Sequence, residues 1–180
     1  MFKNTLRRLL KKKLKDTIRI AGIVNDSIVD GPGLRLTVFT QGCWRRCPGC
    51  HNPQTHDFSG GELKPVSEIL DMVNENDLLD GITLSGGEPF MQPEACASLA
   101  RAVKEMGLSV WCYTGYSFES LVGGGREWRK LLENIDVLVD GAFIFKMKTS
   151  DSQFKGSSNQ RIIDVPASLH ERRIVLSSYN

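Results

Sequence analysis

The stretch that decides the fold of this chain is LRLTVFT at residues 34–40, followed directly by QGCWRRCPGCHNP at residues 41–53. The first part is rich in the apolar, β-branched and aromatic residues that are typical of a buried strand. The second part carries Cys43, Cys47 and Cys50 with the spacing CxxxCxxC. Three thiolates are one ligand short of a closed tetrahedral zinc site or of a cluster held only by cysteines. The segment therefore indicates a metal site with one coordination position open to another ligand.

Short apolar runs alternate with amphipathic segments on both sides of this stretch. Upstream, residues 18–24 and 28–29 suggest a small hairpin around Asn25-Asp26. Downstream, we expect strands over residues 81–84, 108–113 and 135–139 and helices over residues 66–74, 93–106 and 118–132, the last broken by Gly123-Gly124-Gly125. Residues 162–165 and 173–176 are expected to add edge strands. This alternation predicts an α/β fold with a mostly parallel sheet and right-handed crossovers.

The motifs that could carry chemistry all follow predicted strands. The three cysteines follow the first strand, and Ser85-Gly86-Gly87-Glu88-Pro89 follows the second. Thr114-Gly115-Tyr116 follows the third strand and Asp140-Gly141 the fourth. Parallel α/β sheets bind ligands at the carboxyl ends of their strands, so these four segments are expected to meet at one site.

Composition indicates a soluble cytoplasmic enzyme. The chain has 180 residues, 41% hydrophobic and 24% charged, which suits one globular domain. It shows neither an apolar run of membrane-spanning length nor the pattern of a secretory signal. Five cysteines, of which Cys96 and Cys112 stand alone, favour metal or redox use in a reducing compartment over a disulfide framework.

The first 16 residues form a basic segment that differs from the rest of the chain. They carry seven Lys or Arg residues against Asp16 alone, so the remaining residues, with 16 basic and 20 acidic side chains, are net acidic. Leucines at helical spacing among these cations would also suit a helix on a membrane surface or on nucleic acid. We expect a flexible extension over residues 1–16 and a single domain over residues 17–180, with neither membrane nor nucleic acid as a partner.

The glycines and the glutamate after the second strand have two interpretations. Gly86 and Gly87 would let the backbone approach a ligand closely, and Glu88 would offer a carboxylate to an ammonium group. A tight strand-to-helix turn with a solvated glutamate would look the same. Likewise, Arg45 and Arg46 would either offset the negative charge of metal-bound thiolates or form a solvated rim.

The remaining cysteines and two histidines have simpler interpretations. Cys96 and Cys112 are expected to be small buried residues of a helix face and a strand. His51 follows Cys50 directly, and adjacent residues rarely reach one metal ion, so His51 and His56 are expected to line the pocket rather than to bind zinc.

These motifs together resemble a known family. CxxxCxxC after the first strand with GGEP after the second is similar to the radical S-adenosylmethionine (SAM) superfamily. Further motifs resemble the activating proteins of anaerobic ribonucleoside-triphosphate reductases, a match that runs from about residue 18 to residue 165: VDGPGLR (29–35), CPGCHNP (47–53), TGY (114–116), LVDGAF (138–143) and GSSNQR (156–161).

The resemblance implies a fold, cofactors and partners. The fold would be an incomplete (β/α) barrel of the radical SAM type, open on one side to admit a protein substrate. A [4Fe-4S] cluster on the three cysteines would chelate S-adenosyl-L-methionine at its fourth iron and cleave it reductively. The resulting 5′-deoxyadenosyl radical would abstract hydrogen from a glycine of the reductase and leave a glycyl radical there. The electron donor would be of the flavodoxin or ferredoxin type.

The resemblance also implies roles for particular residues. Residues that would hold the methionine amino group are Gly86, Gly87 and Glu88. Thr114 would line the methionine side, and Gly49, Cys50 and His51 would flank the cofactor near its adenosyl part. Contact of Ser157, Ser158 and Asn159 with cofactor or partner is a weaker expectation.

Two alternatives remain open. Pyruvate formate-lyase activases share DGPG and the cysteine loop, but they are longer and carry an Asp where Tyr113 stands here. An activase of another glycyl radical enzyme is therefore the second interpretation, and an auxiliary cluster is excluded because Cys96 and Cys112 are too few to hold one. From a different class, the three cysteines and a histidine would form a structural zinc module.

Overall fold

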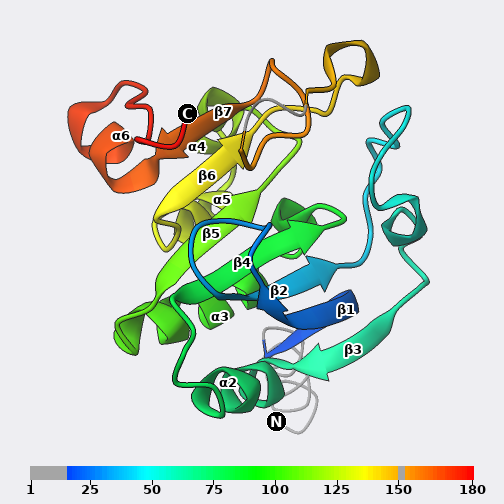
Figure 1. Ribbon diagram of the computed structural model, residues 1–180, viewed down its shortest axis with the longest axis vertical. Helices are drawn as coiled ribbons and strands as arrows, with labels where there is room; N and C mark the ends of the chain where they lie inside the picture. Colours follow the sequence, from blue (N-terminus) through cyan, green and yellow to red (C-terminus); the bar gives the residue numbers. More distant parts are fainter. Residues whose placement is uncertain (1–15, 150–152) are drawn as a thin grey trace, which may run out of the picture.

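Seven strands form one open sheet in the order β3-β1-β2-β4-β5-β6-β7, as Figure 1 shows for the computed structural model, which describes residues 16–149 and 153–180. The strands are β1 (Thr17–Ser27), β2 (Arg35–Thr40), β3 (Glu62–Pro65), β4 (Gly81–Gly86), β5 (Ser109–Tyr113), β6 (Val137–Asp140) and β7 (Arg161–Asp164). The α-helices are α2 (Val66–Asn74), α3 (Pro93–Glu105), α4 (Phe118–Val122), α5 (Arg126–Leu132) and α6 (Val165–Glu171). Short 3-10 turns are η1 (Pro53–Thr55), η2 (Pro89–Met91) and η3 (Phe145–Met147).

The centre of the sheet is parallel and its two flanks are antiparallel. Strands β2, β4, β5 and β6 run parallel to one another, whereas β1 pairs antiparallel with β2 and β3, and β7 pairs antiparallel with β6. In the described part of the chain β3 and β7 end the sheet without pairing to each other. The expected α/β fold with an incomplete, open sheet is therefore confirmed.

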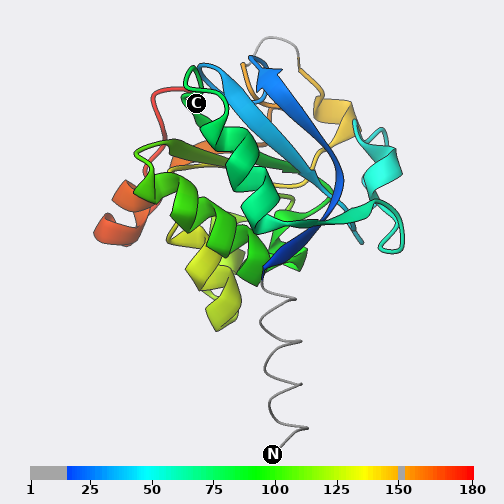
Figure 2. The same cartoon turned by 90° about the horizontal axis from the view of Figure 1, so that it is seen from below.

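Helices cover one face of the sheet (Figure 2). The apolar stripe of α3 buries Ala95, Leu99 and Val103, which pack in the same core as Leu36 of β2 and Leu84 of β4. The predicted break at Gly123-Gly124-Gly125 is confirmed, because α4 ends at Val122 and α5 begins at Arg126. Within the described residues, no helix has both the length and the apolar character needed to cross a bilayer.

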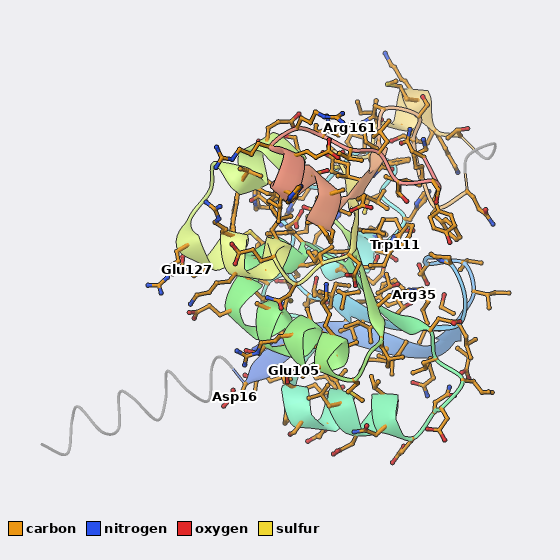
Figure 3. All side chains as sticks on the ribbon, turned by 90° about the vertical axis from the view of Figure 1, so that its left-hand side faces the viewer. Asp16, Arg35, Glu105, Trp111, Glu127 and Arg161 are labelled. Atoms are coloured by element: carbon orange, nitrogen blue, oxygen red, sulfur yellow. The ribbon has the colours of Figure 1, made fainter. Side chains whose placement is uncertain are left out.

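The opposite face of the sheet carries a buried arginine near the amino ends of the strands. Arg35 is 1% exposed, and its five N–H groups donate to the oxygens of Thr83, Pro32, Ile82 and Ser109 at 2.5–3.1 Å. Burial lowers the pKa of Arg35 to about 10, which still keeps the guanidinium charged at neutral pH. Figure 3 shows Arg35 and Trp111 close together on this side. This arginine ties β2 to β4 and β5.

Two predictions about the edges of the sheet were wrong. Residues 18–29 form no hairpin, because β1 continues through Asn25-Asp26 to Ser27 with an irregular register against β2. Residues 173–176 form no strand, since only Leu176 makes an isolated bridge, with Ile163 of β7. The basic segment predicted over residues 1–16 lies, apart from Asp16, outside the described residues.

Candidate active site

The carboxyl ends of the four parallel strands open into one cavity of about 540 Å³. Figure 1 shows the loops that follow these ends reaching beyond the sheet. Most of the predicted site residues line the cavity: Cys43, Cys47, Cys50, His51, Gly86, Gly87, Glu88 and Thr114. Gly49 is not among the lining residues. The loops that follow β2, β4, β5 and β6 therefore converge on one cavity, as the sequence predicted.

The cysteine loop owes its shape to a turn at CPGC. The N–H of Cys50 donates to the carbonyl of Cys47 at 3.1 Å, with Pro48 and Gly49 between them. Gly49 has φ +71°, and Pro followed by a residue of positive φ is the signature of a type II turn. A Cβ on Gly49 would also collide with the ring of Phe145. Gly49 thus shapes the loop without lining the cavity, whereas Cys47 and Cys50 line it.

The glycines after β4 let two loops run against each other. Gly86 has φ +88°, and a Cβ there would lie 2.7 Å from the Cα of Phe39. A Cβ on Gly87 would lie 2.6 Å from the carbonyl oxygen of Gly42. The N–H of Gly87 donates to the carbonyl of Thr40 at 2.8 Å. The close approach that these glycines permit is to the chain itself, from Gly86 to the end of β2 and from Gly87 to Gly42 of the cysteine loop.

Glu88 is a buried carboxylate whose oxygens are already occupied. It is 1% exposed, and its Oε1 accepts hydrogen bonds from Thr114 Oγ1 at 2.8 Å and the N–H of Phe90 at 3.2 Å. Its Oε2 accepts from the N–H of Gly115 at 2.8 Å. Burial raises the pKa of Glu88, and these three hydrogen bonds oppose that rise. The alternative of a solvated glutamate is therefore wrong, and Glu88 joins the β4 loop to the β5 loop.

The thiols provide soft ligands on one wall. Cys43 is buried, and burial raises the pKa of its thiol. Across residues 16–149 and 153–180, no three His, Cys, Asp or Glu side chains are grouped so as to hold a single metal ion. Iron–sulfur clusters are held by Cys thiolates, and a four-iron cluster is larger than one ion, so its ligands stand farther apart. Three thiols facing one open space fit such a cluster.

The GSSNQR segment contributes to the wall of the cavity near His51. Gly156 and Gln160 line it, and the ring of His51 lies 4.9 Å from that of Phe143 at the same wall. Ser157 is buried and accepts a hydrogen bond from the N–H of Ile144 at 3.2 Å. Through these contacts the segment stabilises the loop that precedes η3.

The two other predicted residues of this segment lie farther from the cavity. Asn159 donates to the carbonyl of Ala142 at 2.9 Å, and Ser158 is exposed. Neither is among the residues that line the cavity.

Comparison with known proteins agrees with this geometry. A family model described as "4Fe-4S single cluster domain" matches residues 29–163. The anaerobic ribonucleoside-triphosphate reductase-activating protein of Escherichia coli (strain K12) is 35% identical over 144 residues, which cover 74% of this chain and 90% of that protein. This chain belongs to the family of anaerobic ribonucleoside-triphosphate reductase-activating proteins.

Two other proteins are similar to parts of this member of the activating-protein family. The pyruvate formate-lyase-activating enzyme of Clostridium pasteurianum is 39% identical over 106 residues, or 56% of this chain and 44% of that enzyme. The crystal structure of QueE from Escherichia coli aligns with a TM-score of 0.48 at 13% identity, over 73% of each chain. The likeness to QueE is too distant to add to the assignment.

Several cavity residues of this activating-protein family member were not anticipated. These residues are Val29, Asp30, Phe39, Asn52, Tyr113, Phe143, Phe154 and Lys155. The motifs VDGPGLR, CPGCHNP and LVDGAF contain Val29, Asp30, Asn52 and Phe143 and were the available signal. Phe154 and Lys155 lie outside every motif and had none.

Proposed function

We propose that this chain generates a glycyl radical on an anaerobic ribonucleoside-triphosphate reductase by reductive cleavage of S-adenosyl-L-methionine at a [4Fe-4S] cluster. The observation that carries the proposal is the cavity at the carboxyl ends of β2, β4, β5 and β6, where Cys43, Cys47 and Cys50 face the loops that follow the other strands. Membership of the activating-protein family supports the same conclusion.

The chain's own residues would bind and orient the reactants. Cys43, Cys47 and Cys50 would hold three irons of the cluster and leave the fourth for the cofactor. The backbone around Gly86 and Gly87, with Glu88 and Thr114, would bind the methionine part. His51 would flank the adenosyl part, whereas Gly49 would act through the shape of the loop.

The chemistry itself would come from the bound groups. When bound, the cluster would supply an electron and the cofactor would supply the radical that removes hydrogen from the glycine, while the protein would position both and limit side reactions. An open sheet would leave room for a protein substrate at the cavity mouth. A flavodoxin- or ferredoxin-type protein would deliver the electron, and the reaction would take place in the cytoplasm.

Mixing the reconstituted protein with S-adenosylmethionine, reductant and the anaerobic reductase tests this function. Electron paramagnetic resonance should show a glycyl radical on the reductase, and methionine and 5′-deoxyadenosine should accumulate. Absence of both the radical and the cleavage products with a loaded cluster would exclude the proposal.

A parallel reaction with pyruvate formate-lyase tests the second interpretation, which the likeness to the Clostridium pasteurianum enzyme favours. A radical on pyruvate formate-lyase but none on the reductase would replace our assignment. A colourless protein that retains one zinc ion and never cleaves S-adenosylmethionine would instead identify a structural zinc module.

A further inference from the structure

Three segments around the cysteine loop are basic, although the chain beyond its first 16 residues is net acidic. Residues 41–56, 141–149 and 153–160 contain five Lys or Arg residues and no Asp or Glu, whereas residues 17–180 as a whole carry 16 basic and 20 acidic side chains. Such a separation of charge gives one side of a protein a positive potential that attracts acidic partners. We call basic face the exposed residues Trp44, Arg46, Ile144, Phe145, Lys146, Met147 and Lys148 of these segments.

Contacts between the three segments make their surface continuous. The ring of Phe145 in η3 lies directly against Gly49, in the turn of the cysteine loop. Lys148 forms an isolated bridge with Ser157, which joins the loop after β6 to the loop before β7. Figures 1 and 2 both show η3 beside the loop that follows β2. The basic face therefore adjoins the segment that carries the predicted cluster ligands.

Large apolar side chains are exposed on the basic face together with unpaired lysines. The apolar ones are 40% to 61% exposed, and soluble proteins rarely expose several such side chains together outside interaction sites. Aromatic residues and Met are also enriched in protein interfaces. Within residues 16–149 and 153–180, no ion pair includes Lys146 or Lys148. Apolar side chains beside uncompensated positive charge fit an acidic protein partner.

The basic face lies outside the cavity. None of its seven residues is among those that line the cavity, whereas Cys47 and Cys50 line it. A protein that presents a glycine to the cofactor must reach into the cavity. An electron donor needs only to come close to the cluster, because electron transfer slows steeply with distance. The outer side of the cysteine turn therefore suits an electron donor better than the protein substrate.

We propose that the basic face docks an acidic electron-transfer protein, an inference that rests on the proposed function. Lys146 and Lys148 attract carboxylates of this partner, and the apolar side chains between them and the cysteine turn form the centre of the contact. The reduced donor gives up one electron, and the oxidised cluster takes up that electron, so no bond forms or breaks in this step.

Binding of an acidic flavodoxin and of an acidic ferredoxin to the reconstituted protein tests the inference. Lys146→Glu/Lys148→Glu should weaken binding of the oxidised donor by roughly 10-fold or more at low ionic strength, as measured by isothermal titration calorimetry. Added salt should weaken binding to the parent protein and reduce this difference, because salt screens surface charges. A parent protein that binds neither donor, or equal affinities of parent and variant, would overturn the inference.

A matched control separates the basic face from net charge. Arg126→Glu/Lys130→Glu makes the same change in charge at exposed positions of α5, which lies away from η3 in Figures 1 and 2. This variant should bind the donors within about twofold of the parent protein. Equal losses in the two double variants would mean that net charge alone controls binding, and would overturn the proposed face.

The apolar part of the face has its own test. Ile144→Ser/Met147→Ser should weaken donor binding by roughly 3- to 10-fold at both low and high salt, since burial of apolar surface is not screened. An affinity equal to that of the parent protein would contradict an apolar centre of the contact.

Two reductants separate docking from chemistry. With photoreduced deazaflavin, a small molecule that needs no docking surface, Lys146→Glu/Lys148→Glu should match the parent protein in iron content, cleavage of S-adenosylmethionine and radical formation on the reductase. With reduced flavodoxin at low concentration, cleavage by the variant should be slower by roughly 10-fold or more.

The remaining outcomes distinguish the basic face from the proposed function. A variant that cleaves S-adenosylmethionine with deazaflavin but forms no radical on the reductase would assign the face to the reductase and overturn the inference. If the parent protein with a full cluster cleaves no S-adenosylmethionine with deazaflavin, the proposed function itself fails. Cleavage that is normal in the parent, with donor binding unchanged in Lys146→Glu/Lys148→Glu, rejects the basic face alone.

Discussion

Position in the fold separates the five cysteines into two groups. Cys96 and Cys112 are both fully buried in the core between sheet and helices, whereas Cys43, Cys47 and Cys50 line the cavity. Burial raises the pKa of Cys96 to about 12 and that of Cys112 well above the usual thiol range. Spacing alone predicted this division, because Cys43, Cys47 and Cys50 lie on one loop and the two single cysteines lie in apolar segments.

Replacing single cysteines tests the division. Cys43→Ala, Cys47→Ala and Cys50→Ala should each prevent assembly of a [4Fe-4S] cluster and abolish cleavage of S-adenosylmethionine. Cys96→Ala and Cys112→Ala should retain both, with a stability loss of about 1 kcal/mol from the smaller side chain. Iron analysis, visible absorption and product chromatography give the answer. A folded Cys112→Ala protein without a cluster would contradict the ligand assignment.

The partners of Glu88 could not be predicted from sequence, because they lie in a different loop. The sequence indicated a carboxylate near a ligand, but Thr114 and Gly115 come to it only through the parallel pairing of β4 with β5. A backbone N–H and a hydroxyl carry no sequence pattern that identifies their acceptor. The residue type was predictable, and the contact was not.

Glu88→Gln tests the connection between the two loops. An amide presents an NH₂ group to one of the three donors that now share the carboxylate, so the free energy of unfolding should fall by about 1–3 kcal/mol. Urea unfolding followed by circular dichroism measures this loss. Glu127→Gln, on the exposed side of α5, serves as the control and should be neutral. Equal stability of the two variants would mean that the Glu88 contacts contribute little.

At the scale of elements, helices and inner strands were easier to predict than the edges of the sheet. The helix expected over residues 66–74 matches α2, because its apolar residues recur at helical spacing. Strand β3 was not expected, since it is short and none of its four residues is buried. Helix α6 was not expected either. The false hairpin arose because Asn25-Asp26 has turn character, whereas pairing with β2 holds β1 extended.

A salt-bridge network joins β6, β7 and α4. Arg161 of β7 donates to buried Asp140 at the end of β6 and to Glu119 of α4. The N–H of Phe118 donates to Asp140 Oδ2 at 2.7 Å. The arginine of GSSNQR and the aspartate of LVDGAF therefore belong to one structural unit.

This network predicts an acid-dependent loss of stability. Hydrogen bonds from Arg161 lower the pKa of Glu119 from 4.5 to about 2. A carboxyl with a lowered folded pKa contributes its stability above its unfolded pKa and loses it as pH falls. The contribution of Glu119 should therefore decline between about pH 4.5 and pH 2, and Glu119→Gln should flatten this part of the profile. Unfolding by urea across this range measures it; parallel profiles would refute the idea.

At the scale of the whole molecule, the last residues of the chain pack against the cavity wall and bind to β7. Tyr179 packs its ring 5.8 Å from that of Trp111 and 6.1 Å from that of Phe154, and Phe154 lines the cavity. Asn180 Oδ1 accepts a hydrogen bond from the N–H of Ile162 in β7 at 3.0 Å. Sequence patterns did not predict this arrangement, because it depends on contacts between residues far apart in the chain.

Tyr179→Ala tests the support. Loss of two aromatic contacts should reduce the free energy of unfolding by about 1–3 kcal/mol and change the fluorescence of Trp111. Tyr179→Phe keeps the ring and should resemble the parent protein. Thermal unfolding and emission spectra provide the comparison, and a neutral Tyr179→Ala would show that the ring adds nothing to the fold.

Arg35 lies at the opposite end of the sheet from the loops that form the cavity. The hydrogen-bond acceptors of Arg35 lie outside the cysteine loop and the loops that follow β4, β5 and β6, so we expect substitutions in those loops to leave its hydrogen bonds intact. The same separation makes the cavity rim a suitable place for transplanting loops from a related activase.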